Sequence, residues 1–150
     1  MEKNYSYEEI LERDGRLVYK FRGVSMRPLL HQGRDLFILE KKPERPFRKG
    51  EVVAFRRGKD VVLHRIIRVE EDGYTILGDN SVIPERGVRD EEILGVMTGY
   101  IRKGKTHQVE ELPYRIYSRW ILATRGFRIP RIRLVSKIKR LLRRRTSEAK

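Results

Sequence analysis

The chain has 150 residues, no cysteine and a formal net charge of +14 at pH 7. This length suffices for one domain of ordinary size with its own core, and it leaves little room for a second. The lack of cysteine excludes disulfide bonds, thiolate zinc sites and a cysteine nucleophile. Any nucleophile must therefore be a hydroxyl group or a lysine.

The positive charge lies almost entirely in the C-terminal quarter. Residues 1–113 carry 22 Lys and Arg against 20 Asp and Glu, whereas residues 114–150 carry 13 against 1. The chain as a whole therefore does not have the charge distribution of a nucleic-acid-binding protein. It contains no apolar run long enough to cross a membrane, and its polar N-terminus does not resemble a signal peptide. We expect a cytoplasmic protein or one peripheral to a membrane.

In chain order, the predicted elements are a short helix and then a series of strands. Ser6 suits an N-cap and acidic residues follow it, so residues 6–13 are expected to be helical. After a turn at Asp14 and Gly15, segments rich in β-branched and aromatic residues alternate with turn residues. This pattern predicts a mostly β fold of the small-barrel kind. The predicted strands are Leu17–Phe21, Asp35–Glu40, Glu51–Phe55, Val61–Val69, Tyr74–Leu77 and Ile93–Ile101.

Two of these segments carry candidate catalytic residues. Ser25 follows the first strand, and Pro28 forces a turn three residues later, which would expose the hydroxyl and free its backbone amide. His64 interrupts the apolar strand Val61–Val69, either as a hydrogen-bonded histidine of the barrel wall or as a general base. Asp79 comes shortly after the next strand. Hydroxyl, imidazole and carboxylate are the three parts of a serine hydrolase.

The ordered segments around these residues resemble the conserved boxes of type I signal peptidases. They are SMRPLL (25–30), RDLFIL (34–39), KGEVVAF (49–55), LHRIIRV (63–69), GDN (78–80) and ILGVMTGYI (93–101). The resemblance runs from Gly23 to Lys103 and implies the β-barrel fold shared by signal peptidases and LexA-like peptidases. LexA-type repressors use a Ser–Lys pair and a preceding DNA-binding domain, for which twenty polar N-terminal residues are too few. The resemblance therefore points to the signal peptidase branch.

The resemblance also assigns roles to individual residues. It implies that Ser25 is the nucleophile and that His64 replaces the lysine base of most bacterial members, as in the endoplasmic-reticulum and archaeal branch. It implies that Asp79 orients His64, although Glu85 is an alternative. Met26 and Pro28 of the serine box are the expected substrate-binding residues. No cofactor and no metal are expected, because His31 and His107 lack partners at a suitable spacing.

The resulting hypothesis is a serine endopeptidase that cleaves a leader or signal-like segment from a peptide or protein. Members of the family are anchored by transmembrane helices, and none is expected here. The alternative is a non-catalytic module on the same fold that binds a peptide or a membrane surface. The expected organisation is a helical lead-in at 1–16, a catalytic β domain at 17–113 and a basic amphipathic tail at 114–150.

The tail is predicted to contain a helix with an apolar stripe. After Pro130, apolar residues recur at helical spacing: Leu134, Ile138, Leu141 and Leu142. Such a helix could lie on an anionic membrane surface, or its stripe could pack on the barrel with the arginines in solvent. Nucleic-acid binding ranks third, because no stacking platform or known motif accompanies the charge.

Overall fold

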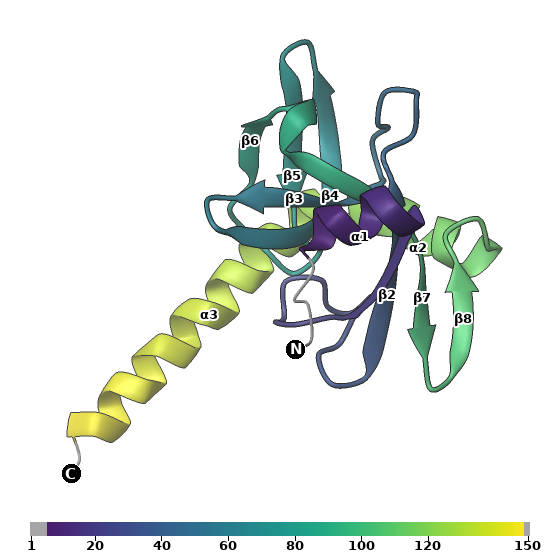
Figure 1. Cartoon of the computed structure of the whole chain (residues 1–150). Coiled ribbons are helices and arrows are strands. Elements are labelled where there is room, and N and C mark those ends of the chain that lie inside the picture. The colour runs from purple at the N-terminus through teal and green to yellow at the C-terminus, as the bar shows by residue number, and fades with distance from the viewer. Residues whose placement is uncertain (1–5, 149–150) are drawn as a thin grey trace.

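The computed structural model describes the backbone of residues 6–148 and the side chains of residues 6–140. A curled antiparallel sheet of eight strands forms the body, with a short helix at one end of the chain and two helices at the other (Figure 1). Strands pair in the order β1-β2-β7-β3-β4-β5-β6, and β8 pairs with β7. The elements are α1 (Tyr7–Asp14), β1 (Arg16–Lys20), β2 (Asp35–Lys41), β3 (Val52–Arg57), β4 (Asp60–Glu70), β5 (Gly73–Leu77), β6 (Glu85–Val88), the 3₁₀ turn η1 (Asp90–Glu92), β7 (Ile93–Arg102), β8 (Lys105–Gln108), α2 (Leu112–Ala123) and α3 (Arg125–Glu148).

The predicted mostly β fold is confirmed, and so are the N-terminal helix and all six predicted strands, within a few residues at their ends. Ser6 caps α1 with the reciprocal bonds of a capping box to Glu9. The structure adds β6 and β8, each of four residues. Their sequences, ERGV and KTHQ, are too short and too polar to show an alternating pattern, so only pairing with β5 and β7 makes them strands.

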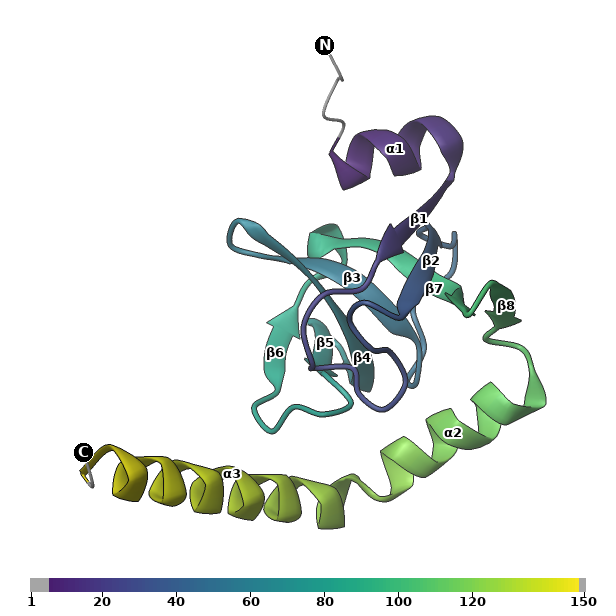
Figure 2. The same ribbon diagram turned by 90° about the horizontal axis from the view of Figure 1, so that it is seen from below.

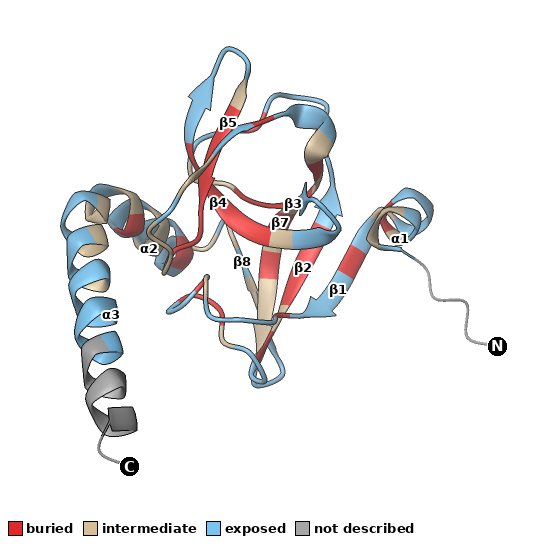
Figure 3. Cartoon of the chain, turned by 90° about the vertical axis from the view of Figure 1, so that its left-hand side faces the viewer, coloured by how far each residue is buried: buried red, intermediate tan, exposed pale blue. Residues whose placement is uncertain are grey.

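The core lies on both sides of β3, which is why that strand is buried at four consecutive positions. Val52 and Ala54 belong to one apolar cluster, whereas Val53 and Phe55 belong to the other. Neighbouring side chains of a strand point to opposite faces, so β3 contributes to both clusters in turn. Figure 3 displays the resulting band of buried residues through the centre of the sheet.

The loop that carries Ser25, residues 22–34, is attached to the sheet at the C-terminal end of the loop. Asp35 begins β2, is buried, and accepts hydrogen bonds from Arg34, Arg102 and the His31 amide. These hydrogen bonds outweigh the effect of burial and hold the pKa of Asp35 well below its usual range. Arg102 also donates to the Leu29 carbonyl. The end of the 22–34 loop is therefore tied to β2 and β7.

The predicted helical tail is confirmed, and it forms two helices. Helix α3 begins at Arg125 and includes Pro130, and α2 precedes it. Helix α2 lies against the body and buries Tyr114 and Ile121, whereas α3 projects away from it (Figures 1 and 2). The boundary predicted at residue 113 falls within the first turn of α2. No helix within residues 6–148 has the length and hydropathy needed to span a bilayer.

Candidate active site

The turn that carries Ser25 and the ring of His64 meet at Gly78. A methyl group placed on Gly78 would lie 2.7 Å from the Ser25 carbonyl oxygen and 2.9 Å from Nε2 of His64. It would also lie 2.5 Å from Oγ of Ser81. Only glycine leaves room for these three groups to converge, which explains the first residue of the Gly-Asp-Asn segment.

A cleft with a volume of about 340 Å³ contains both predicted catalytic residues. Its lining includes Ser25, His64 and Ser81, together with residues of β1 to β4 and Tyr7 of α1. Many of the lining side chains are apolar or aromatic, among them Tyr19, Phe21, Phe37, Leu39, Ala54 and Val62. The predicted nucleophile and base therefore share an accessible cavity with an apolar side.

His64 is buried on β4 and is kept neutral by its surroundings. Burial is the main cause that lowers its pKa to about 4, the positive charge of Arg57 lowers it further, and the negative charge of Asp79 opposes both. The buried Nδ1 atom has no hydrogen-bond partner among the described residues. Oε1 of Glu85 lies 4.0 Å from Nδ1, beyond hydrogen-bond distance, and accepts a hydrogen bond from Arg57 at 3.0 Å.

Asp79, the predicted orienting carboxylate, is bound by other groups. Its two oxygens accept hydrogen bonds from Nε and Nη2 of Arg65, both at 2.8 Å. The Tyr117 hydroxyl donates to the same carboxylate at 2.8 Å. Both side chains of the ion pair are almost completely buried, with exposures of 0% for Arg65 and 1% for Asp79. The carboxylate makes no hydrogen bond to His64 within the described part of the chain.

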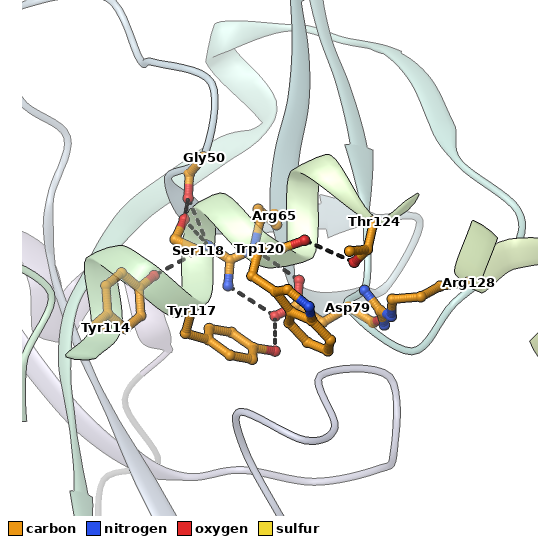
Figure 4. Close-up of polar contacts among 9 residues, drawn as sticks. All are labelled: Gly50, Arg65, Asp79, Tyr114, Tyr117, Ser118, Trp120, Thr124 and Arg128. Carbon is orange, nitrogen blue, oxygen red and sulfur yellow. Dashed lines mark hydrogen bonds and ion pairs between the residues drawn. The ribbon is translucent and has the colours of Figure 1, made fainter. Parts of the chain in front are cut away.

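Arg65 also connects the sheet to α2 (Figure 4). Its Nη1 atom donates to the Gly50 carbonyl at 2.8 Å, to Oγ of Ser118 at 2.9 Å and to the Tyr114 hydroxyl at 3.3 Å. Burial alone would lower the pKa of Arg65, but the hydrogen bonds and charge of Asp79 raise it above its ordinary value. Arg65 therefore remains charged, and Gly50 together with two α2 side chains accepts hydrogen bonds from the Nη1 donors that Asp79 leaves free.

The residue after Asp79 holds the serine turn. The backbone amide of Asn80 donates to the Ser25 carbonyl at 2.7 Å, and its side-chain amide donates to the Val24 carbonyl at 3.2 Å. Asp79 thus affects the site indirectly. Its ion pair with Arg65 fixes the backbone segment that holds the Ser25 turn beside His64.

Residues 2–98 match the family described as Peptidase S24-like. The chain belongs to this family. It is also similar to the signal peptidase complex catalytic subunit SEC11C of Homo sapiens, Mus musculus and Canis lupus familiaris, at 38% identity over 74 residues. The match covers 45% of this chain and 38% of each relative, so the chain spans less than half of their length. The predicted place in the signal peptidase and LexA-like superfamily is confirmed.

The two residues predicted to bind substrate do not face the cleft of this Peptidase S24-like chain. Met26 is fully buried in the core and supports the Ser25 turn from below, whereas Pro28 is exposed. Neither lines the cavity that holds Ser25 and His64. A serine box places both residues next to the nucleophile in sequence, but a sharp turn sends successive side chains in different directions.

Sequence reasoning missed three groups that this site uses. Arg57 comes from the end of β3 and Ser81 from the loop after β5, and Tyr117 belongs to a segment assigned to the tail. The one signal for Tyr117 in the sequence was Arg65 within an apolar strand, because a buried arginine needs polar partners; Arg57 and Ser81 had none. Among the described residues, no group of three or more His, Asp or Glu side chains gathers closely enough to hold a metal ion.

Removal of Arg65 tests the structural role of the buried pair. We expect Arg65→Met to lower the free energy of unfolding by about 3–5 kcal/mol, because it leaves the Asp79 carboxylate buried without its positively charged partner. Arg68→Met is the matched control: it makes the same change on the same strand, at a side chain that is 68% exposed. Urea unfolding followed by circular dichroism would measure both variants, and equal losses in the two would contradict this role.

Proposed function

We propose that this chain is a serine endopeptidase of the signal peptidase type, with Ser25 as nucleophile and His64 as general base. The observation that supports this most directly is the convergence of the Ser25 turn and Nε2 of His64 at Gly78, inside one cleft. Family membership supports the reaction class. The neutral state of His64 supports its role, because only an unprotonated imidazole can accept the serine proton.

The proposed reaction proceeds through an acyl-enzyme. Oγ of Ser25 attacks the carbonyl carbon of the scissile peptide bond while Nε2 of His64 takes the hydroxyl proton. The tetrahedral intermediate collapses, the carbon–nitrogen bond breaks, and His64 delivers the proton to the leaving amine. A water molecule then attacks the ester with His64 again as the base, which releases the acid and restores Ser25. The Ser25 amide, which donates no hydrogen bond within the described residues, is available to the oxyanion.

Glu85 is the better candidate than Asp79 to orient His64. For Nε2 to accept the serine proton, Nδ1 must carry a proton, and a buried N–H group needs an acceptor. Glu85 is the carboxylate nearest to Nδ1, at 4.0 Å, and a small shift in the substrate complex would close that gap. The oxygens of Asp79 are already taken by Arg65 and Tyr117.

The cleft favours an extended apolar segment as substrate. The aromatic and aliphatic wall beside Ser25 suits apolar side chains, and peptide residues there would lose contact with water. Lys20, Arg22 and Arg57 line the same cleft and make it positively charged. A leader or signal-like segment, removed from a peptide or protein, fits the apolar wall.

Loss of the hydroxyl or of the imidazole should abolish cleavage. We expect Ser25→Ala and His64→Ala each to reduce cleavage of a proteome-derived peptide library by at least about a thousandfold, because the two groups act in the same step. Mass spectrometry of the products measures cleavage. The matched controls are Ser136→Ala, at an exposed position of α3, and His107→Ala, which does not line the cleft. Full activity in either site variant would refute the mechanism, provided that circular dichroism confirms folding.

The carboxylate assignment has its own test. We expect Glu85→Gln to lower kcat by about 10- to 100-fold with little change in KM, because it would orient the base without binding substrate. Its thermal unfolding midpoint should barely change, since the ion pair of Glu85 with the half-exposed Arg57 contributes little to stability. Asp79→Asn should instead lower that midpoint strongly. The reverse pattern, with the kinetic effect confined to a stably folded Asp79→Asn protein, would restore Asp79 as the orienting group.

The fall of kcat/KM at acidic pH should reflect protonation of His64. With its pKa near 4, the base stays neutral down to that pH, so kcat/KM should fall only as the pH drops through about 4. Arg57→Gln removes a positive charge that disfavours the protonated ring, and it frees the Glu85 carboxylate. Both changes raise the pKa of His64, so kcat/KM should begin to fall at a higher pH than in the unmodified protein.

The control for this shift is Arg56→Gln, which removes the neighbouring arginine that pairs with Glu8. It should leave the acidic fall of kcat/KM where it is. Because the chain has only three histidines, proton NMR can follow the His64 ring directly. A His64 titration near pH 6.5 in the unmodified protein would contradict the buried, neutral base.

The alternative is a module on the same fold that holds a peptide without cutting it. The missing hydrogen bond at Nδ1 of His64 is the observation that favours it, because an assembled serine triad would have one. Under this alternative the unmodified protein and Ser25→Ala would retain the same library peptides uncut. Under the proposal only Ser25→Ala would retain peptides that the unmodified protein cleaves.

A further inference from the structure

Most of helix α3 stands clear of the rest of the molecule. Figures 1 and 2 display it as an arm that leaves the body beyond its first turns. Every described side chain from Arg133 to Arg140 is exposed. Ile129 and Ile132 are partly buried in a pocket that is also lined by α2, the 78–81 loop and residues of β4 and β5. One apolar face of α3 therefore has a partner in the fold.

A second apolar face of α3 is uncovered. Phe127, Leu134 and Ile138 are 85%, 58% and 48% exposed. They are spaced at i, i+7 and i+11, which places them along one side of a helix. Val135, 44% exposed, lies next to them. Single exposed apolar residues are common, but an aligned stripe on a projecting helix indicates a surface that something covers. Leu141 and Leu142, which the sequence adds to this stripe, lie outside the residues whose side chains are described.

Strong positive charge accompanies the stripe, and Arg131 lies on the stripe itself between Phe127 and Leu134. From Leu112 to Ser147 the sequence contains no Asp or Glu. Arg131, Arg133, Lys137, Lys139 and Arg140 are all exposed on α3. No ion pair involves any of these five side chains within the described residues. The surface that covers the stripe must therefore be both apolar and negatively charged.

This combination decides among the possible partners. A second copy packed helix to helix would bring two rows of cations together, and residues 112–147 contain no Asp or Glu to neutralise them, so like charges would oppose it. A nucleic acid would satisfy the cations but would leave the aligned apolar side chains without an apolar partner. A bilayer with anionic headgroups supplies negative charge at its surface and hydrocarbon just beneath it.

We propose that α3 is an interfacial helix that binds anionic membrane surfaces through Phe127, Leu134 and Ile138, with its arginines and lysines among the headgroups. The first turns of α3 pack on the 78–81 loop, which also lines the cleft of Ser25 and His64. Binding would therefore hold the cleft beside the bilayer. The inference does not rest on the proposed peptidase activity, since it follows from α3 alone.

The chain itself permits a position-specific test, because it has no native cysteine. An environment-sensitive fluorophore is attached to Ile138→Cys on the exposed stripe or to Ser136→Cys, which lies two residues away on the opposite side of α3. With vesicles of phosphatidylcholine and phosphatidylglycerol in equal parts, the emission maximum of the fluorophore at position 138 should shift to shorter wavelength. The label at 136 should remain in water, and vesicles of phosphatidylcholine alone should change neither.

Co-sedimentation with the same vesicles measures affinity. Using the full chain in the Ser25→Ala background, so that no cleavage intervenes, we expect Leu134→Ser/Ile138→Ser to weaken binding roughly tenfold or more. Val69→Ser/Ile83→Ser is the matched control, because it removes two exposed aliphatic side chains from β4 and the 80–84 loop. Raising the salt concentration should also weaken binding.

Several results would overturn the proposal. These are no binding to anionic vesicles, equal binding to uncharged vesicles, or an equal loss in the stripe variant and its control. A concentration-dependent dimer that disappears in Leu134→Ser/Ile138→Ser would assign the stripe to a second copy. Tighter binding to duplex DNA than to vesicles, unaffected by the stripe variant, would assign the charge to nucleic acid.

Discussion

The buried ion pair between Arg65 and Asp79 is the interaction on which the rest of this structure depends. A charge removed from water is costly unless it is paired and its remaining donors are satisfied. Asp79 supplies the pairing, while Gly50, Tyr114 and Ser118 satisfy what is left of the guanidinium. One residue of the sheet therefore fixes both the loop after β5 and the position of α2.

Ser25 and His64, the proposed catalytic pair, are held by this arrangement although neither makes a hydrogen bond to the ion pair. Asn80 follows directly after Asp79 and holds the Ser25 turn through two hydrogen bonds, and Gly78 precedes it and leaves space beside the His64 ring. In the Gly-Asp-Asn segment, Gly78 thus leaves space for the His64 ring, Asp79 fixes the segment through Arg65, and Asn80 holds the Ser25 turn. Because Asp79 is paired with Arg65, it need not be the carboxylate that orients His64, although it is close to His64 in the fold.

The sequence was informative where a pattern reflects local physics. The six longer strands were recognisable from their apolar composition. Ser25 and His64 stood out only as candidates, one at a forced turn and the other within an apolar strand, and the resemblance to the signal peptidase boxes was needed to give them roles. Asp79 could not be assigned to Arg65 from spacing, since 14 residues separate partners that only the pairing of β4 with β5 brings together. Helix α2 was grouped with the tail because its charge resembles that of α3. Its inner face, with Tyr114 and Tyr117 directed at the Arg65 pair, becomes distinct only when the sheet is present.

His64 and Arg65 are consecutive residues of one strand, and the alternation of a strand directs them to opposite faces. One faces the cleft and the other faces α2, so the chemistry and the attachment of the helix are set by a single choice of register between β3 and β4. A substitution can change either function alone. A one-residue insertion or deletion in β4 before His64 would instead exchange the two side chains between faces, burying the imidazole against the helix and turning the arginine into the cleft. The strand can therefore vary in composition far more freely than in length.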